Sequence, residues 1–341
     1  TQLTIGQVIL DANGPGNTYE DINNVLAPGY NVIEAPDCNH AAFGRHIDEV
    51  FDSELNSNVF RFYIHTTPDN DRCVKMDRQR NEIKTYANSP DNLKATENET
   101  VVYKWKFKLP AGFQTSPNFT HIHQIKSVGG LYSSMPMYTL TVRKGNSSRL
   151  ELRYAQTDRQ VTLKQTNIAP FINTWVSVEE TITFGNNGSY AIEMKNTSTN
   201  ATLFSYTNNA IINWQTGADF ARPKWGIYRS LIHNEDLRDE EVLFANFSIK
   251  ETQSLNNENI KITSEKILLV PNPAKQIVSI KNIKAEDYDK IQVFDSTGKK
   301  VLSEKQRKDH QVDISSLSSG LYHITLLNSN LKVKTLKFIV E

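Results

Sequence analysis

Apolar and polar residues alternate with a period of two through most of the first 250 or so residues. The clearest segments are rich in β-branched or aromatic residues and are bounded by Gly, Asn, Pro or Ser: 58–65, 100–109, 137–144, 149–154, 174–184, 189–196 and 241–250. Such alternation is typical of short, half-buried β-strands. Many short antiparallel strands predict an all-β chain whose main domain is a two-sheet β-jelly-roll sandwich, concanavalin-like in architecture.

Helical periodicity is rare. The best candidates are "TYEDINNVL" at 18–26 and "NHAAFGRHIDEVFDSEL" at 39–55, where apolar residues recur at helical spacing. We therefore predict at most short helices in these two places.

The pattern changes near residue 252, where a polar stretch begins that has no apolar periodicity. Further short strands follow from residue 267, and "DSTGKK" at 295–300 predicts a hairpin turn in which Gly298 takes a positive φ. We predict three parts: a jelly-roll domain at 1–251, a linker at 252–264 and a smaller β-sandwich domain at 265–341.

Length and charge exclude several classes of protein. No run of about 18 apolar residues occurs, so no membrane-spanning helix is expected. The 38 basic and 38 acidic residues cancel, whereas a nucleic-acid-binding protein usually carries a basic excess. The first residues lack the basic and apolar pattern of a signal peptide, so we expect none in this chain.

The chain has two cysteines, Cys38 and Cys73. A disulfide between them would fit an extracellular or periplasmic location, and two unpaired buried thiols are the alternative. We expect the bridge to fix the segment that carries His40 and His46 near one end of a substrate groove. Purely structural histidines are an equally good interpretation.

Three segments carry unusually polar strands. In "DRQRNEIKTY" (77–86), alternation puts Arg78, Arg80, Glu82 and Lys84 on one face, which is too charged for the space between two sheets. A solvated strand face is the simpler interpretation. Cations spaced by about 7 Å would also suit a chain of anionic sugars, which arginine forks bind bidentately.

The second segment is "FTHIHQIKSVGG" (119–130). Alternation puts Gln124 and Lys126 on one face and His121 and His123 on the other, unless a bulge turns one of these side chains to the opposite face. Zinc binding by the two histidines would need further ligands, which the neighbouring sequence does not offer, so we expect no metal here. A buried, hydrogen-bonded histidine is the alternative.

The third segment is "RPKWGIYRS" (222–230), where Tyr228 shares a face with Gly226, and Arg229 lies on the other face. A tyrosine beside a glycine on a polar face is open to a ligand. Taken alone, it would more often be a packed strand tyrosine.

The C-terminal part resembles a known export signal. The matching segments are "PNPAK" (271–275), "VFDSTGKKV" (293–301) and "DISSLSSGLYHITL" (313–326), followed by a lysine-containing last strand. They are similar to the C-terminal sorting domain of Bacteroidetes proteins exported by type IX secretion. The resemblance implies a secreted or cell-surface protein that is handled by that machinery through a removable tail. A carbohydrate-binding module is the alternative for this part.

The three polar strands together resemble the active-site strands of jelly-roll polysaccharide lyases. "RNE" (80–82) is similar to an Arg-(Ser/Thr)-Glu strand of alginate lyases, and "HQIK" (123–126) lies where that family has Gln-x-His. "WGIYR" (225–229) looks like their Gly-x-Tyr strand. The longer pattern most resembles ulvan lyases of polysaccharide lyase family 28. Lys126 departs from it, because several relatives have histidine there.

The resemblance implies β-elimination from a uronic-acid polysaccharide, with ulvan as the first candidate and no required cofactor. Such a reaction needs a group that neutralises the carboxylate, a base for C5 and an acid for the leaving oxygen. The candidate catalytic residues are Tyr228, Lys126, His123 and Gln124, and the base could be any of the first three. The candidate substrate-binding residues are Arg78, Arg80, Glu82, Lys84, Arg229 and His40.

Other functions stay open at this stage. The target could be glucuronan, alginate or a heparin-type polymer, or the same surface could bind a polysaccharide without cutting it. A glycoside hydrolase needs two carboxyl groups about 5–9.5 Å apart across the bond, whereas Glu179 and Glu180 are adjacent and point to opposite faces. "TPDNDRC" (67–73) is the one loop we consider for a structural Ca²⁺. We expect a monomer.

Overall fold

The computed structural model describes residues 7–252, 267–305, 309–328 and 331–341. The chain folds as two compact units, 1–254 and 255–341. Apart from Thr252, the linker that we predict at 252–264 lies outside the described residues. No helix in the described ranges is long and apolar enough to cross a membrane.

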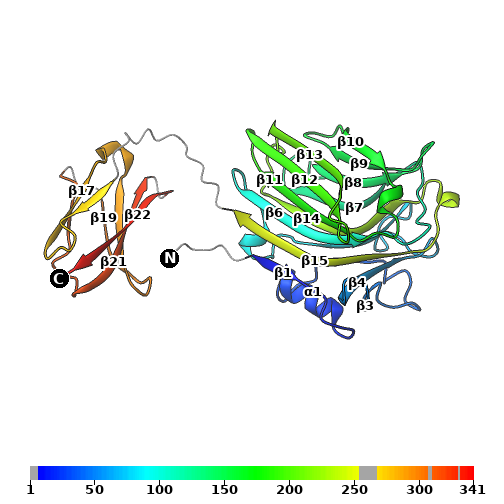
Figure 1. The fold of residues 1–341 in the computed structure, drawn as a ribbon, viewed down its shortest axis with the longest axis horizontal. Coiled ribbons are helices and arrows are strands. Elements are labelled where there is room, and N and C mark those ends of the chain that lie inside the picture. Colours follow the sequence, from blue (N-terminus) through cyan, green and yellow to red (C-terminus); the bar gives the residue numbers. More distant parts are fainter. Residues whose placement is uncertain (1–6, 253–266, 306–308, 329–330) are drawn as a thin grey trace. The chain divides into compact units, whose positions relative to one another are not determined.

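The first unit is a sandwich of two large antiparallel sheets (Figure 1). The eight-stranded sheet has the order β13-β12-β11-β6-β15-β4-β3, and β1 pairs with β15. Its strands are β1 (Val8–Leu10), β3 (Ile47–Asp52), β4 (Ser57–Ile64), β6 (Thr100–Lys108), β11 (Val176–Thr183), β12 (Gly188–Asn196), β13 (Thr202–Ile211) and β15 (Glu240–Thr252).

The seven-stranded sheet has the order β10-β9-β8-β7-β14-β5-β2. Its strands are β2 (Ile33–Glu34), β5 (Arg78–Lys84), β7 (Thr120–Val128), β8 (Tyr138–Arg143), β9 (Arg149–Tyr154), β10 (Val161–Asn167) and β14 (Phe220–Ser230). The segments that we predict as strands from their period-two pattern all form strands, and the all-β jelly-roll prediction is confirmed.

Aromatic side chains fill the space between the two sheets. The ring of Trp105 on β6 lies 6.1 Å from that of Trp225 on β14, and Trp225 lies 5.0 Å from Phe247 on β15. Tyr138 on β8 stacks on Tyr190 of β12 at 4.0 Å. Each pair joins one sheet to the other, so this core fixes which face of each strand is left for other tasks.

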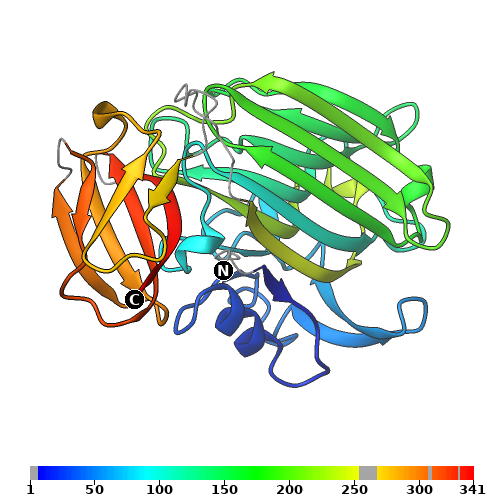
Figure 2. The ribbon, with the colours of Figure 1, turned by 60° about the vertical axis from the view of Figure 1, so that its left-hand side comes forward.

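One of the two predicted helices is observed. Helix α1 (Thr18–Leu26) buries Ile22 and Leu26 and contacts β1 and β3 (Figure 2). The prediction of a helix at 39–55 is wrong, because the segment turns at Gly44 (φ +92°) and then enters β3, which pairs with β4. The other helices are single 3₁₀ turns: η1 (Asp91–Leu93), η2 (Ala169–Phe171), η3 (Asn234–Asp236) and η4 (Ala285–Asp287).

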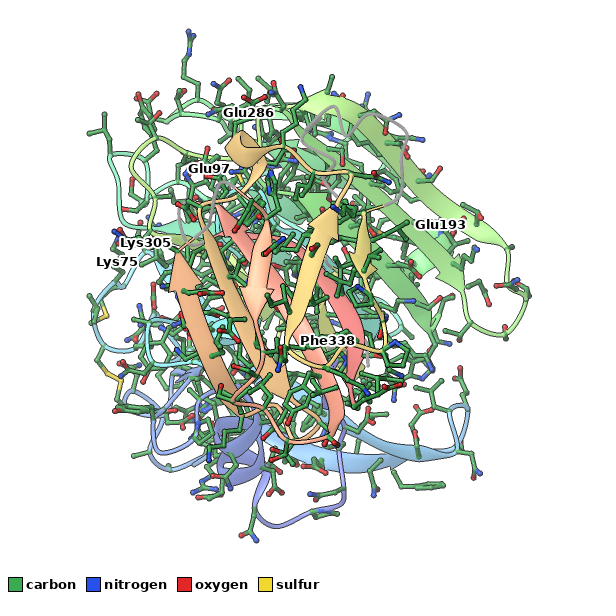
Figure 3. All side chains as sticks on the ribbon, turned by 90° about the vertical axis from the view of Figure 1, so that its left-hand side faces the viewer. Lys75, Glu97, Glu193, Glu286, Lys305 and Phe338 are labelled. Carbon is green, nitrogen blue, oxygen red and sulfur yellow. A yellow bond between two sulfur atoms is a disulfide. The ribbon has the colours of Figure 1, made fainter. Side chains whose placement is uncertain are left out.

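The second unit has its own two sheets and its own core. Strands β16 (Leu268–Val270), β17 (Ile277–Lys281) and β20 (Gln311–Asp313) form one sheet; β18 (Lys290–Asp295), β19 (Lys300–Lys305), β21 (Gly320–Asn328) and β22 (Leu331–Val340) form the other. Phe338, labelled in Figure 3, is fully buried in this core. Gly298 has φ +85° in the turn between β18 and β19, as predicted.

Candidate active site

One face of the seven-stranded sheet is turned away from the aromatic core and carries most of the predicted site residues. We call it the polar face, formed by Arg78, Arg80, Glu82 and Lys84 of β5, His121, Gln124 and Lys126 of β7, and Arg222, Lys224, Gly226 and Tyr228 of β14. The alternate residues of β5, Gln79, Asn81 and Ile83, are fully buried between the sheets. The predicted assignment of the two faces of β5 is therefore confirmed.

A bulge in β7 separates the two histidines. His121 pairs with Thr141 of β8 and His123 pairs with the next residue, Leu140, so Ile122 is an extra residue in β7. Ile122 packs in the core, and His121 turns to the polar face beside Tyr228, with ring centroids 5.8 Å apart. Regular alternation would put both histidines on one face; the bulge that the sequence left open is present and separates them.

His123 lies between the sheets, which corrects its placement among the residues that would meet substrate. It is 1% exposed; its Nε2 lies 2.8 Å from Glu180 Oε2 and its Nδ1 lies 2.9 Å from the backbone oxygen of Lys224. Trp105 packs on its ring at 4.3 Å. The position is that of a buried, hydrogen-bonded core histidine, the alternative that the sequence left open.

A network of buried ion pairs supports the polar face. Glu82 of β5 is fully buried and accepts hydrogen bonds from Arg80, Gln124 and Lys224. Glu34 of β2 accepts from Lys84 and Arg72 at 2.7 Å and also pairs with Lys224. Glu82 therefore holds other side chains in place and is too deeply buried to be the substrate contact that we expected.

The charges of this network are strongly coupled. Burial alone would raise the pKa of Glu82, but Lys224 and Arg80 lower it to about 2. The pKa of Glu34 is also far below its usual range, because Lys224, Arg80, Lys84 and Arg72 outweigh its desolvation. Both carboxyl groups are therefore ionised at neutral pH and cannot donate a proton as acids.

Tyr228 lies at the centre of a cationic and aromatic group. Arg78 Nη1 donates a hydrogen bond of 3.1 Å to Tyr228 Oη, and the guanidinium carbon of Arg80 lies 3.6 Å from the centre of the ring. Phe119 packs on the ring at 5.1 Å. Arg80 Nε in turn donates a hydrogen bond of 2.9 Å to Asp71 Oδ1. The phenol is thus fixed in position, with positive charge beside it.

The close approach of β5 and β14 depends on Gly226. Its φ is +141°, and a Cβ at this position would lie 2.1 Å from Asn81 O and 2.7 Å from Glu82 Cα. Only glycine fits. This spacing pairs Tyr228 with Arg80 across the two strands.

Lys126 is the second unusual group of the polar face. Its Nζ donates to Ser134 O at 3.3 Å, and no carboxylate of the described chain lies within ion-pair distance. Desolvation and the nearby charges of Lys224, Arg222 and Arg80 lower its pKa to about 8. Arg222, its cross-strand partner on β14, likewise has no carboxylate within ion-pair distance among the described residues. Two cations thus lie side by side on the polar face, each bonded to a backbone oxygen and not to a carboxylate.

His121, in contrast to Lys126, is an uncharged group of the polar face. Burial lowers its pKa to about 3, and its Nδ1 has no hydrogen-bond partner among the described residues. It is neutral at physiological pH and lies beside Tyr228, whereas Lys126 pairs with Arg222 further along β14. The polar face thus holds two separate pairs of neighbouring residues, His121 with Tyr228 and Lys126 with Arg222.

Two other predicted substrate contacts lie elsewhere. Arg229 is fully buried between the sheets, where Nε donates to Gln79 Oε1 at 2.7 Å and Nη1 to Arg238 O at 2.8 Å. His40 contacts Asp69 at 2.9 Å and the rings of neighbouring aromatic residues, and no hydrogen bond joins it to β5, β7 or β14 in the described part of the chain. Neither residue is on the polar face.

The disulfide is present. Cys38 and Cys73 are bonded, with Cα atoms 6.3 Å apart and a sequence separation of 35. It joins the end of the β2 region to the loop that precedes β5. Free thiols, the alternative for the two cysteines, are therefore excluded.

Sequence reasoning missed Glu34, Lys224, Arg222 and the role of Asp71. Lys224 could have been found, because it shares the face of Tyr228 in the alternation of β14. Glu34 lies in a two-residue strand with no periodic pattern of its own, so nothing local points to its contact with Lys84 fifty residues later.

Comparisons with known proteins place each unit in a family. A family model described as "Polysaccharide lyase" matches residues 47–260, and a "Secretion system C-terminal sorting domain" matches 269–341. No curated protein matches the chain in sequence.

Similar solved structures include an alginate lyase of Aplysia kurodai, with 14% identity, a TM-score of 0.50, and coverage of 73% of this chain and 99% of that one. A glucuronan lyase of Trichoderma reesei has 16% identity and a TM-score of 0.45, covering 60% and 87%. The sorting domain marks a secreted or cell-surface protein of the Bacteroidetes type. The family model covers most of the chain, and the chain belongs to the polysaccharide lyase family.

Proposed function

We propose that this lyase cleaves a uronic-acid-containing polysaccharide by β-elimination, and that its substrate is sulfated, with ulvan as the first candidate. The observation that carries the proposal is the polar face, where Tyr228 lies beside Arg78 and Arg80. Further along this face, Lys126 and Arg222 have no carboxylate within ion-pair distance among the described residues. Arginine forks suit both carboxylate and sulfate groups.

The reaction breaks two bonds and forms one π bond. A base removes the proton from C5, the electron pair forms the C4=C5 double bond, and the C4–O4 bond breaks. The departing oxygen takes a proton from an acid. The carboxylate at C5 must be neutralised, because negative charge builds up beside it as the proton leaves.

We assign the anion contacts to Arg222 and to Arg78, whose partly exposed guanidinium pairs only with the exposed carboxylate of Asp77 among the described residues. In one assignment of the proton transfers, neutral Lys126 takes the C5 proton and Tyr228 protonates the leaving oxygen. In the other, Tyr228 takes the proton and returns it to the oxygen in a syn elimination. Gln124, Arg80, Glu82 and Lys84 act as supports in both, because their charged or amide groups are engaged with one another or with Glu34.

The decisive experiment adds purified protein to ulvan, glucuronan, alginate and heparin and follows the ultraviolet absorbance of the new double bond. We expect a rise with ulvan. A rise with another polymer alone would keep the elimination and discard the substrate. Binding without any rise would support a polysaccharide-binding module.

The same assay should be run on Tyr228→Phe, with Tyr30→Phe as the matched control, since Tyr30 is 51% exposed and lies off the polar face. We expect Tyr228→Phe to lose about 10²–10⁴-fold in kcat while it still binds the polymer. The control should keep full activity. Equal activity of the two variants would refute the role of Tyr228.

A further inference from the structure

We propose that His40, His46, His65 and Asp69 form a binding site for a divalent transition metal, with Zn²⁺ the best match, that orders the loop before β5. These four side chains come from the turn after Cys38, the residue before β3, the residue after β4 and the loop that follows it. Their ligand atoms all lie within 4.8 Å of one another.

The carboxylate of Asp69 is the centre of the cluster, and it is fully buried. His40 Nδ1 lies 2.9 Å from Oδ1, His46 Nε2 lies 3.3 Å from Oδ1, and His65 Nδ1 lies 3.0 Å from Oδ2. Three imidazole nitrogens thus converge on one carboxylate. An ion of the size of Zn²⁺, with bonds of about 2.0–2.2 Å, needs small shifts of these side chains to enter.

His46 gives an independent indication of a ligand. Its side chain is fully buried, yet its Nε2 has no hydrogen-bond partner in the described part of the chain and points toward the cluster. Its other nitrogen, Nδ1, lies 2.8 Å from Asp37 Oδ1. A carboxylate that accepts the Nδ1 proton leaves the lone pair of Nε2 free, which is the arrangement of metal-binding histidines.

The surroundings enclose the cluster. The ring of Phe43 lies 5.3 Å from that of His40, 4.7 Å from His46 and 4.4 Å from His65. The disulfide closes the same region, since Cys38 and Cys73 flank the cluster in sequence. The two partly exposed members, His40 and His65, provide the way in for an ion.

The donor set selects the metal class. Three imidazoles and one carboxylate match tetrahedral Zn²⁺, whereas Ca²⁺ takes six to eight oxygen ligands. Asp69 lies in the loop at 67–73, where the sequence suggested Ca²⁺. The three histidines around it offer nitrogen ligands, which suit Zn²⁺ and not Ca²⁺. Because the protein supplies all four ligands, the site is structural and leaves no open position for substrate.

The loop connects the cluster to the polar face. The backbone oxygen of Asp69 accepts a hydrogen bond of 3.0 Å from Gln79 Nε2 on β5. Two residues later, Asp71 holds the guanidinium of Arg80, which lies over the ring of Tyr228. Metal binding would therefore act on catalysis through the position of Arg80.

The test uses the full chain without a histidine tag. The protein is stripped with a chelator, incubated with Zn²⁺ alone and analysed for bound metal and thermal stability. We expect one Zn²⁺ per chain and a Tm that rises with the free Zn²⁺ concentration. Neither readout depends on the substrate, so failure here would leave the proposed lyase activity untouched.

Variants separate this site from adventitious binding. His65→Ala should abolish stoichiometric binding, and Asp37→Asn should weaken it by about 10–100-fold. His233→Ala is the control, because His233 is exposed and pairs with Glu235 outside the cluster. If wild type binds no Zn²⁺, or if His65→Ala binds it as tightly as His233→Ala does, the cluster is a hydrogen-bond network around Asp69 and the proposal is wrong.

Discussion

At the scale of single residues, the proposed chemistry of the polar face rests on Lys126 and Tyr228. Tyr228 is held by Arg78 and Arg80, and His121 is its neutral neighbour. Lys126 lies beside Arg222, where burial and like charges favour its neutral form. The position of the base in the reaction can therefore be read from how activity depends on pH.

If Lys126 is the base, kcat/KM rises with pH and levels off above about 8, because only the neutral amine accepts a proton. Lys126→Arg keeps the positive charge but cannot lose its proton in this pH range, so the variant should lose about 10²–10⁴-fold in activity. Lys104→Arg is the control, since Lys104 lies on the other sheet and pairs with Glu179 at 2.8 Å. A Lys126→Arg enzyme with the wild-type pH profile would assign both proton transfers to Tyr228.

At the scale of strands, the polar face depends on the spacing and charge balance of β5 and β14. Gly226 allows the two backbones to approach, and Glu82 neutralises Arg80 and Lys224 between them. Both features are buried, so changes there should act on stability before they act on chemistry.

Gly226→Ala should destabilise the first unit by about 1–3 kcal/mol from overpacking, with backbone strain in addition. Gly16→Ala is a matched control: its φ of +143° is nearly the same, but a Cβ there meets nothing within 4 Å. Urea unfolding of both variants isolates the steric cost. Equal losses of stability would show that φ alone matters at Gly226.

The pKa of Glu82 also predicts how the stability of the folded chain depends on pH. Its pKa in the folded chain is about 2, below the usual 4.5, so its ionic contribution is complete above pH 4.5 and is lost as the pH falls toward 2. Glu82→Gln should cost about 3–5 kcal/mol at pH 7, because Arg80 and Lys224 each lose one of their buried carboxylate partners. The cost should shrink in acid, which urea unfolding at several pH values would test. A cost that does not change with pH would contradict this account.

The strands could be predicted from the sequence because alternation is a local signal. The faces of β5 and β14 follow from it directly, whereas the bulge at Ile122 does not, since nothing in "HIH" distinguishes an extra residue from a regular one. The helix expected at 39–55 fails for a related reason: apolar spacing there fits a helix, but pairing with β4 decides the outcome. Contacts between distant segments, such as Glu34 with Lys224, need the folded chain.

At the scale of the whole molecule, the two units have separate hydrophobic cores. Every residue assigned to the polar face belongs to the first unit, and the sorting domain contributes none. A chain that ends at residue 254 should therefore keep its kcat within about twofold and its Tm within a few degrees. Activity assays and calorimetry on the shortened and full chains would check this. Loss of activity without unfolding would give the sorting domain a role in catalysis.

The bridge between Cys38 and Cys73 has a practical consequence for producing this protein. The bond tethers the loop whose Asp71 accepts a hydrogen bond from Arg80, so we expect correct assembly of the polar face to require oxidation. Cytosolic thiols stay reduced, while periplasmic and extracellular ones are oxidised. A recombinant chain made in a reducing cytoplasm should lack the disulfide, so that its loop is not tethered and its specific activity is low. Mild oxidation after purification should restore the activity. The expression compartment therefore decides whether the enzyme that is assayed carries the disulfide.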